Sequence, residues 1–460
     1  VAATPRPRRG YAAATSRGDA AAATRIVCFD ESRRRGHAAA TSRGGDTCRY
    51  ATVEAGDVDL ATPGSCKVGD ATVEVVDALD DYVAMLGECF DFAKIRNFVE
   101  SCKPPLLFDA MHGAAGPAAS RVLCDELGVP RASLYRCDPR PDFGGAHPDP
   151  NLKWASELVR RASLKEDGSP GPELGEALAL GVAFDGDGDR NMIVGHRFFC
   201  SPSDSLAVLA ANANSVKWFS DRGGLAACAR SMPTSRALDR VAAKQGLECY
   251  ETPTGWKFFG NLMELKSPFL CGEESFGTGA DHVREKDGLW AALAWLSVLA
   301  DANAASNTFV GVGDVVKEHW RAYGRDLYCR HDYEEVESAG AEEMMARLSG
   351  LVGSKGLADL DPDLEAVSSF AYVDPLDKSE TSNQGMILEF AGGGRVVFRL
   401  SGTGSAGATV RVYVERPVAE PTEADLDLVA SEALSDLADR GKSVAQLHEF
   451  VGREGPSVIT

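Results

Sequence analysis

The chain has 460 residues, 44% of them hydrophobic and 25% charged, which is ordinary for a globular protein of about three domains. Its formal net charge of −20 argues against nucleic acid or an anionic membrane as the main partner. No run of 18 apolar residues occurs, so no segment is expected to span a bilayer. Twelve cysteines without a C-x-x-C pair indicate reduced core residues of an intracellular protein, rather than a disulfide framework or a zinc site.

Residues 1–50 differ in composition from the rest of the chain. They hold ten arginines, no lysine and four acidic residues, and the heptamer Ala-Ala-Ala-Thr-Ser-Arg-Gly occurs at 12–18 and again at 38–44. Such a segment buries too little apolar surface to fold alone, so we expect it to be disordered. Two interpretations are open, a transit-peptide-like leader and an incorrectly predicted or truncated start. The acidic residues and the repeat favour the second.

Residues 76–200 are expected to form an α/β unit, because strand-like and helix-like segments alternate there. A helical periodicity of apolar residues runs through 77–102, and an apolar strand over 105–109 follows it. A strand is predicted over 72–76, at the start of this region, and the unit itself is expected to contain a helix over 118–127 that stops at Gly128 and a Gly/Pro/Asp loop over 142–150.

The sequence Phe-Asp-Gly-Asp-Gly-Asp-Arg-Asn is the strongest signal of the chain. Asp185, Asp187 and Asp189 are separated only by glycines, which let the backbone curl so that three carboxylates converge on one hard cation. An EF-hand is excluded, because Arg190 and His196 stand where it needs glycine and glutamate. Apolar runs on both sides disfavour an acidic surface turn, so the pattern predicts a strand-loop-strand site for a divalent metal. The arginine that follows at once offers a planar fork suited to a phosphate.

Residues 201–305 are expected to form a second α/β unit. This unit begins at a helix cap over 201–204 and ends with a helix over 288–299, whose two tryptophans are expected in the core. Residues 306–330 are expected to be a linker to the next unit.

Two loops of this second unit carry polar residues suited to a ligand. Thr254 and Gly255 offer a hydroxyl and a bare backbone, although an ordinary turn explains them equally well. Glu273 and Ser275 lie in a glycine-bounded loop, and carboxylates and hydroxyls bind sugar hydroxyls at fixed angles. That loop does not match the G-x-S-x-G nucleophile elbow. Lys286 follows in a charged loop that, taken alone, is typical of a solvated helix cap.

Residues 331–460 mix predicted strands with a helix and are expected to be α+β. Arg399, Ser401 and Thr403 stand among glycines whose backbone N–H groups can approach an anion, so the segment predicts a phosphate cradle. The glycines also match G-x-G-x-x-G, but that dinucleotide motif requires a following helix, and the next segment, which contains Arg411, is strand-like. Predicted strands cover 385–390, 395–400 and 409–414, and a predicted helix covers 423–438.

Together these motifs resemble the phosphoglucomutase and parafusin group of the α-D-phosphohexomutases. The resemblance runs from about residue 57 to residue 460, and several such motifs in one order are highly specific. The motifs that carry it are Asp109-Ala110-Met111-His112-Gly113, Asp142-Phe143-Gly144-Gly145, Asp185 to Arg190, Arg230 to Ser235, Thr252 to Phe259, Gly272 to Gly277 and Arg399 to Gly407.

The resemblance implies consecutive α/β domains with mixed sheets and a C-terminal α+β domain, which in the complete family fold surround one cleft. It implies interconversion of glucose 1-phosphate and glucose 6-phosphate through a phosphoserine and glucose 1,6-bisphosphate, with Mg²⁺ as the metal. Hexose phosphates are the expected small-molecule partners, with no role for nucleic acid or a membrane. The complete protein is expected to be a monomer in the cytoplasm, or in a plastid if the first segment is a leader.

Carried over onto this sequence, the resemblance assigns the Mg²⁺ to Asp185, Asp187 and Asp189. It makes Lys286 a candidate acid or base, and the nucleophilic serine has no candidate. The implied contacts to the sugar phosphate are Arg190, Thr254, Gly255, Glu273, Ser275 and Lys286, and the implied contacts to the non-reacting phosphate are Arg399, Ser401, Thr403 and Arg411.

The family's phosphoserine loop, Thr-Ala-Ser-His-Asn-Pro-Gly-Gly, has no counterpart in the 460 residues, and residues 51–75 match only the tail of the family's first domain. Without that nucleophile the covalent route is closed, so the chain as written is expected to be inactive. One hypothesis is a phosphoglucomutase whose serine domain is missing because the start of the sequence is wrong. The other is an inactive sugar-phosphate-binding pseudoenzyme or scaffold. The intact loops of the other three units favour the first.

Overall fold

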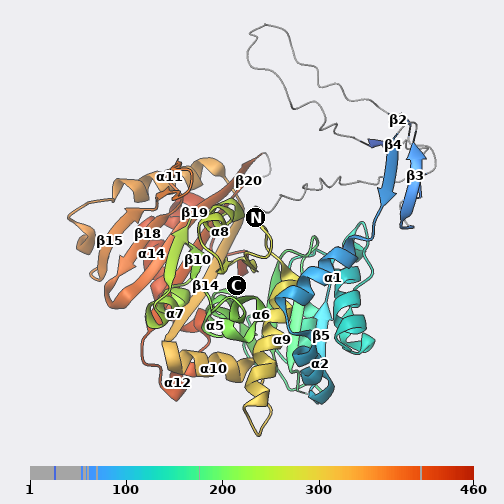
Figure 1. Cartoon of the computed structure of the whole chain (residues 1–460). Coiled ribbons are helices and arrows are strands. Elements are labelled where there is room, and N and C mark those ends of the chain that lie inside the picture. The colour runs from blue at the N-terminus through green and yellow to red at the C-terminus, as the bar shows by residue number, and fades with distance from the viewer. Residues whose placement is uncertain are drawn as a thin grey trace, which may run out of the picture. The chain divides into compact units, whose positions relative to one another are not determined.

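The computed structural model describes residues 25–26, 53–54, 58–59, 62–68, 71–175, 177–404 and 407–460 (Figure 1). Its contacts divide the chain into two units, Val1–Tyr82 and Val83–Thr460, which are described separately. The expected disorder of residues 1–50 falls outside the described residues, apart from the short strand β1 (Arg25–Ile26). None of the described helices is long and apolar enough to cross a bilayer.

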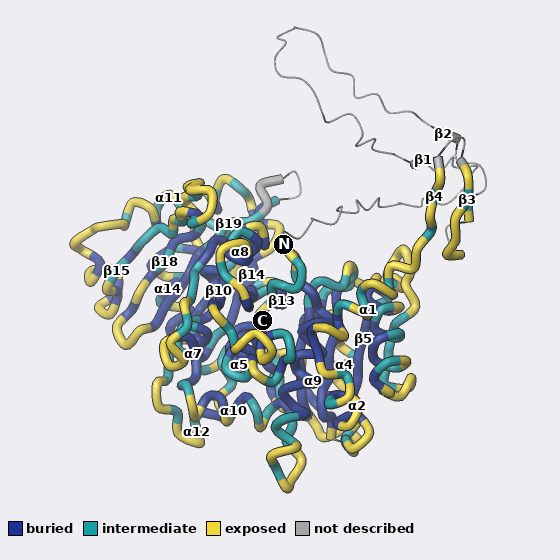
Figure 2. The backbone as a smooth tube through the Cα atoms, in the orientation of Figure 1, coloured by how far each residue is buried: buried dark blue, intermediate teal, exposed yellow. Residues whose placement is uncertain are grey.

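The first unit contains two small antiparallel ladders. β1 pairs with β2 (Val53–Glu54), and β3 (Gly64–Val68) pairs with β4 (Ala71–Val75) along its whole length. The strand expected over 72–76 is therefore present and begins one residue earlier. The described side chains of β3 and β4 are exposed or half-buried (Figure 2), so this hairpin buries little apolar surface.

The second unit begins with a mixed sheet of strand order β6-β5-β7-β8-β9. β6, β5 and β7 are parallel, whereas β8 and β9 are antiparallel to their neighbours. The strands are β5 (Leu106–Asp109), β6 (Leu134–Tyr135), β7 (Leu180–Phe184), β8 (Asn191–Gly195) and β9 (Phe198–Cys200), and the helices of this region are α1 (Ala78–Cys89), α2 (Phe92–Ser101), α3 (Ala115–Ala119) with a π-helical continuation (Ser120–Glu126), and α4 (Ser156–Arg161).

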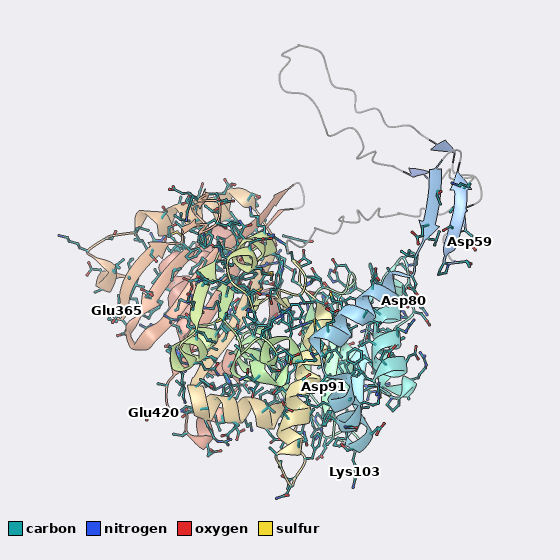
Figure 3. All side chains as sticks on the ribbon, viewed as in Figure 1. Asp59, Asp80, Asp91, Lys103, Glu365 and Glu420 are labelled. Atoms are coloured by element: carbon teal, nitrogen blue, oxygen red, sulfur yellow. The ribbon has the colours of Figure 1, made fainter. Side chains whose placement is uncertain are left out.

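The single helix expected over 77–102 is two helices in the structure. Asp91 (Figure 3) begins α2, because its carboxylate accepts the backbone N–H of Lys94 at 3.0 Å. Phe90, between the two helices, is 1% exposed, so the break turns an aromatic ring into the core. The helix expected to stop at Gly128 does so, since this glycine has a left-handed φ of +75°.

A second sheet has the order β11-β10-β12-β13, with the first three strands parallel and β13 antiparallel. The long helix α9 (Gly288–Ala304) packs against strands of both sheets, and its Trp290 and Trp295 are fully buried, as the sequence predicts. The remaining elements here are β10 (Ala227–Ser231), β11 (Glu248–Thr252), β12 (Phe269–Gly272), β13 (Thr278–Ala280), α5 (Pro202–Ala211), α6 (Lys217–Ser220), α7 (Ala237–Gln245) and α8 (Trp256–Leu265).

The segment 306–330, expected as a linker, is folded in the structure. It contains helix α10 (Val312–Tyr323), whose apolar side packs against α5, α7 and β9. Trp320 is 5% exposed, and its indole N–H donates to the carboxylate of Asp204 at 2.9 Å. The linker expectation fails because residues 312–320 bury one face against a helix more than a hundred residues earlier, a partner that local sequence does not reveal.

The third sheet has the order β15-β18-β19-β20-β14-β21 and is antiparallel throughout. Helices α11 and α14 pack against it over a shared apolar core, so this region is α+β as expected. The strands are β14 (Arg325–Val336), β15 (Leu364–Ser369), β18 (Met386–Phe390), β19 (Gly394–Gly404), β20 (Gly407–Val418) and β21 (Val458–Ile459), beside a separate ladder of β16 (Tyr372–Val373) with β17 (Glu380–Thr381), and the helices are α11 (Ser338–Gly350), α12 (Glu423–Leu426), α13 (Ala430–Ala433), α14 (Ser435–Ala445) and α15 (Leu447–Val451).

The continuous helix expected over 423–438 is wrong, because the structure breaks it into α12, α13 and the start of α14. The guanidinium of Arg325 donates to the backbone carbonyls of Asp425, in α12, and of Leu428, in the break that follows it. Those carbonyls therefore bond a distant arginine instead of continuing the helical ladder.

Candidate active site

The three aspartates lie on a tight loop between the buried antiparallel strands β7 and β8. Asp185 is 2% exposed, and its Oδ1 accepts the backbone N–H groups of Gly188 and Arg190, each at 3.0 Å. The φ of Gly188 is +84°, a left-handed conformation that glycine adopts without strain. One carboxylate oxygen from each of Asp185, Asp187 and Asp189 lies within 4.8 Å of the other two. The three carboxylates therefore converge.

Burial, together with this convergence, disfavours ionisation of two of the three carboxyls. Burial raises the pKa of Asp189 to about 6, a shift that the ammonium of Lys286 opposes and the Asp185 carboxylate increases. Burial and the Asp185 carboxylate also raise the pKa of Asp187. A divalent cation would relieve this repulsion, and carboxylate oxygens are the ligands that Mg²⁺ and Ca²⁺ prefer. The residues present therefore fit the metal that the sequence predicts.

Two carboxylates hold the side chain of Arg190 beside the loop of the three aspartates. Its Nε donates to Asp185 Oδ2 at 2.6 Å, and its other guanidinium nitrogen NH1 donates to Asp149 Oδ1 at 2.8 Å. Asp149 belongs to the Gly/Pro/Asp loop, which the sequence did not connect to this arginine. The guanidinium is thus fixed in orientation before any anion arrives.

The glycine-bounded loop between β12 and β13 lies next to the aspartate loop. A β-bridge joins Arg190 to Gly277, and the backbone N–H of Asn191 donates to Phe276 O at 2.8 Å. Lys286 Nζ lies 3.2 Å from Asp189 Oδ2 and 3.9 Å from Glu273 Oε2. The ammonium of Lys286 therefore lies beside a carboxylate of the candidate metal site and beside a carboxylate of the loop 273–277, which we call the sugar-type loop.

The side chain of Lys286 passes close to the backbone of Gly277. A Cβ built there would lie 2.5 Å from Lys286 Cδ and 3.2 Å from Glu273 Oε2. The lysine side chain thus occupies the volume that any other residue would fill.

Thr254 and Gly255 precede helix α8 and meet the same loop. The Gly255 N–H donates to Glu273 Oε1 at 3.1 Å, and the φ of Gly255 is +127°. Thr254 Oγ1 is buried and has no hydrogen-bond partner within the described part of the chain. Burial and the neighbouring Glu274 carboxylate raise the pKa of Glu273, while Lys286 opposes the shift. A buried hydroxyl without a hydrogen-bond partner and a carboxyl with a raised pKa are both suited to binding a polar ligand.

The predicted phosphate cradle is the hairpin of β19 and β20. Arg399 lies directly opposite Arg411, and Ser401 lies opposite Thr409. Arg411 Nε is 3.8 Å from Asp332 Oδ1 and, among the described residues, makes no hydrogen bond. Two like charges opposed on neighbouring strands repel, so this arrangement favours a bound anion. The side chain of Thr403 lies outside the described residues.

The structure thus brings the predicted site residues together in two groups. The first contains Asp185, Asp187, Asp189, Arg190, Thr254, Gly255, Glu273, Ser275 and Lys286, and the second contains Arg399, Ser401 and Arg411. Among the described residues we find no direct hydrogen bond or ion pair between the two groups.

Family models cover most of the chain. Phosphoglucomutase/phosphomannomutase alpha/beta/alpha domain II matches residues 80–197, and domain III of the same group matches residues 202–323. The C-terminal domain of phosphoglucomutase-1 matches residues 325–457. The chain belongs to the α-D-phosphohexomutase family. The mixed sheets and the C-terminal α+β region described above are consistent with the fold of these phosphohexomutases.

Relatives of this chain carry the name phosphoglucomutase. Phosphoglucomutase 1, chloroplastic, of Marchantia polymorpha is 49% identical over 409 residues, which cover 88% of this chain and 61% of the relative. Phosphoglucomutase, cytoplasmic, of Pisum sativum is 46% identical over 88% of this chain and 70% of the relative. The open form of parafusin from Paramecium superposes with a TM-score of 0.78 at 44% identity, covering 88% and 69% of the two chains. The chain therefore spans about three fifths to seven tenths of the length of these relatives.

Several polar residues near the candidate site were not assigned a role from sequence. Asp149 orients Arg190, and Glu274 holds the turn that follows β10 through hydrogen bonds to Ser231 and Thr234. The Arg230 to Ser235 motif was visible in the sequence, but its spacing gives no indication of which distant loop it contacts.

Proposed function

We propose that this chain carries the metal-binding, sugar-binding and phosphate-binding parts of a phosphoglucomutase. The reaction is the interconversion of glucose 1-phosphate and glucose 6-phosphate through glucose 1,6-bisphosphate. The observation that carries the proposal is the position of Lys286 Nζ, 3.2 Å from Asp189 and 3.9 Å from Glu273. Phosphoryl transfer to a sugar needs a cation, a fixed positive charge and hydroxyl recognition at one point, and these three residues supply them.

In this proposal Asp185, Asp187 and Asp189 hold a Mg²⁺, which when bound neutralises charge on the transferring phosphoryl group. Arg190 contacts a phosphate oxygen, and its orientation by Asp149 lowers the entropy lost in that contact. Glu273 and Ser275 bind sugar hydroxyls, with the N–H of Gly255 holding Glu273.

Two roles are open to Lys286. As an acid or base it moves a proton to or from the hydroxyl that exchanges the phosphoryl group, and as a fixed cation it only neutralises the phosphate. Lys286→Arg keeps the charge but not the capacity to lose a proton near neutral pH. When the variant is made in a fusion of residues 76–460 to the first domain of the Marchantia relative, retained turnover supports the second role, and lost turnover with retained binding supports the first.

At the other end of the ligand, Arg399, Ser401, Thr403 and Arg411 hold the phosphate that does not react. A bidentate arginine contact suits this task, because it fixes orientation as well as charge. A hexose bisphosphate has a phosphate at each end, so the same two groups of residues can accept it in either direction. The other implied properties remain part of this proposal: a monomer, in the cytoplasm or, alternatively, a plastid.

The test joins the first domain of the Marchantia relative to residues 76–460 and measures glucose 6-phosphate formation in a coupled assay with glucose 1-phosphate, glucose 1,6-bisphosphate and Mg²⁺. We expect turnover in this fusion and only background with these 460 residues alone, in which no match to the phosphoserine motif occurs. Turnover by the 460-residue chain would contradict our expectation of inactivity. A folded fusion that binds glucose 1-phosphate without turnover would instead favour the inactive sugar-phosphate-binding protein.

A further inference from the structure

A four-residue turn, Ser231 to Thr234, contacts both the sugar-type loop and strand β19, which carries Arg399 and which we call the phosphate-type strand. The turn begins at Ser231, the last residue of β10, and its two hydroxyl-bearing residues, Ser231 and Thr234, are 0% and 1% exposed. It belongs to neither group of candidate ligand residues. Its contacts nevertheless lead from one group to the other.

On one side, the turn holds the residue next to Glu273. Ser231 Oγ donates to Glu274 Oε2 at 2.9 Å, and the backbone N–H of Glu274 donates to Thr234 Oγ1 at 2.9 Å. The two hydroxyls also bond each other at 2.7 Å. Glu274 is 2% exposed, so the hydrogen bonds of this carboxylate are shielded from water and depend on the turn. A shift of the turn would therefore move the backbone that carries Glu273 and Ser275.

On the other side, β19 grips the carbonyls of the same turn. Arg395, 4% exposed, donates to Met232 O at 3.2 Å and to Thr234 O at 3.0 Å. Its Nε donates to Glu415 Oε2 at 2.9 Å, which fixes the guanidinium against the next strand. Buried charge-assisted bonds of this kind hold geometry rigidly, because breaking one leaves an uncompensated charge.

The same face of β19 continues to the phosphate-type arginine. Arg395, Val397 and Arg399 are every second residue of the strand, so their side chains share one face. Met232 packs in one buried cluster with Val397 and Tyr413, and the Tyr413 hydroxyl accepts a hydrogen bond from Arg399 NH1 at 3.4 Å.

The side chains of Met232 and Arg399 both lie against Gly385. A Cβ at this position would lie 2.7 Å from the Met232 side chain and 3.0 Å from the Arg399 side chain. The methionine of the turn therefore lies within a short distance of the stem of the phosphate-type arginine.

We propose that Ser231, Thr234 and Glu274 are positioning residues, which set the distance between the sugar-type loop and the phosphate-type strand. None of them needs to touch the ligand. They determine whether both ends of a hexose phosphate can be held at once, because a turn displaced by one lost hydrogen bond misaligns one end relative to the other. The inference rests on the proposed function, since it presumes that Glu273 and Arg399 hold the two ends of one ligand.

The test uses the full 460-residue chain with Mg²⁺ and measures two ligands by calorimetry, glucose 1-phosphate and inorganic phosphate. In Ser231→Ala we expect binding of glucose 1-phosphate to weaken about tenfold, as for the loss of a buried hydrogen bond to a carboxylate. Binding of inorganic phosphate, which engages only the phosphate end, should change less than twofold. Thr234→Val, which keeps the side-chain shape, should show the same division.

Ser235→Ala is the matched control. Ser235 is the next residue of the chain, is 1% exposed, and its hydroxyl accepts the N–H of Ala237 rather than bonding Glu274. This control should leave the ratio of the two affinities unchanged. Equal weakening of both ligands in Ser231→Ala and Thr234→Val, or the same ratio as in Ser235→Ala, would overturn the inference while leaving the proposed function intact. If the unaltered chain binds glucose 1-phosphate no more tightly than inorganic phosphate, the proposed function fails and the inference with it.

Discussion

Arg399 on β19 lies directly opposite Arg411 on β20, so two arginines emerge on the same face of neighbouring strands. Such a pair destabilises a sheet unless an anion or a carboxylate neutralises it. Asp332 lies opposite Arg411 on the other side and approaches Arg411 Nε at 3.8 Å. Asp332 is also paired with Arg330, at 2.9 Å, so one carboxylate serves three arginines and positive charge is left to attract a phosphate.

The first prediction concerns this pair. Arg399→Ala should weaken binding of glucose 1-phosphate at least tenfold, because a charge-assisted phosphate contact is worth about 1.5–3 kcal/mol. Calorimetry measures the effect. Lys355→Ala, which removes an equal charge from an exposed position, is the control and should bind like the parent. Parent-like affinity in Arg399→Ala would mean that the hairpin is not the phosphate site.

The second prediction concerns the metal. Asp187→Ala leaves two of three converging carboxylates, so the affinity for Mg²⁺ should fall about tenfold or more, since hard cations depend on the number of charged oxygen ligands. Titration calorimetry with Mg²⁺ alone checks this. Glu365→Ala on β15 (Figure 3) removes an exposed carboxylate from another sheet and should have no effect. If the two variants bind Mg²⁺ equally well, the ligand assignment is wrong.

The third prediction uses two glycines with opposite surroundings. Gly277→Ala should displace Lys286, whose Cδ lies 2.5 Å from the added methyl position, and should abolish measurable binding of glucose 1-phosphate. Gly87→Ala lies within helix α1 with no heavy atom within 4 Å of its new Cβ, and should raise the free energy of unfolding by about 0.5–1 kcal/mol. Urea unfolding and calorimetry on both variants check these opposite outcomes. Normal ligand binding in Gly277→Ala would argue against the position of Lys286.

The fourth prediction concerns pH. Burial, aided by the charge of Arg240, lowers the pKa of His319 to about 3, whereas an unfolded histidine has a pKa near 6.5. The unfolded state therefore binds the proton first, so this contribution to stability is complete above pH 6.5 and is lost as the pH falls toward 3. At pH 5 the loss is about 2 kcal/mol.

His319→Phe removes this titration, so the free energy of unfolding, measured with urea, should differ less between pH 7 and pH 5 than it does in the parent. Phenylalanine keeps a ring in the stack with Tyr323. His448→Phe, at an exposed position, serves as the control and should keep the parental difference. An unchanged pH dependence in His319→Phe would show that this histidine does not contribute.

The fifth prediction concerns the choice of sugar. Glu273 is 5% exposed and bonds the N–H of Gly255, so its carboxylate is fixed in direction. Glu273→Ala should reduce the preference for glucose 1-phosphate over mannose 1-phosphate, because a directed acceptor for one hydroxyl is lost. The ratio of the two dissociation constants is the measured quantity. A parental ratio in this variant would move hydroxyl recognition to another residue.

Short-range patterns were sufficient for much of this protein. The Asp-Gly-Asp-Gly-Asp spacing predicted the convergence of three carboxylates, and the structure brings those oxygens within 4.8 Å of one another. The strands on either side, the core position of Trp290 and Trp295, and the helix stop at Gly128 were also predictable. In each case the cause acts between residues close in the chain: alternation of apolar side chains, glycine at a left-handed φ, or carboxylates separated by a few bonds.

The tertiary structure alone decided which distant residues meet. Lys286 reaches Asp189 because a β-bridge joins Arg190 to Gly277, and nothing in either loop indicates that pairing. Arg325 breaks the helix expected over 423–438 from about a hundred residues earlier. The bonds of Glu274 to the Ser231 turn likewise depend on the packing of one strand end against a loop. Local sequence determines backbone preferences and the kind of chemistry, whereas strand register and the burial of charge determine which chemical groups share a site.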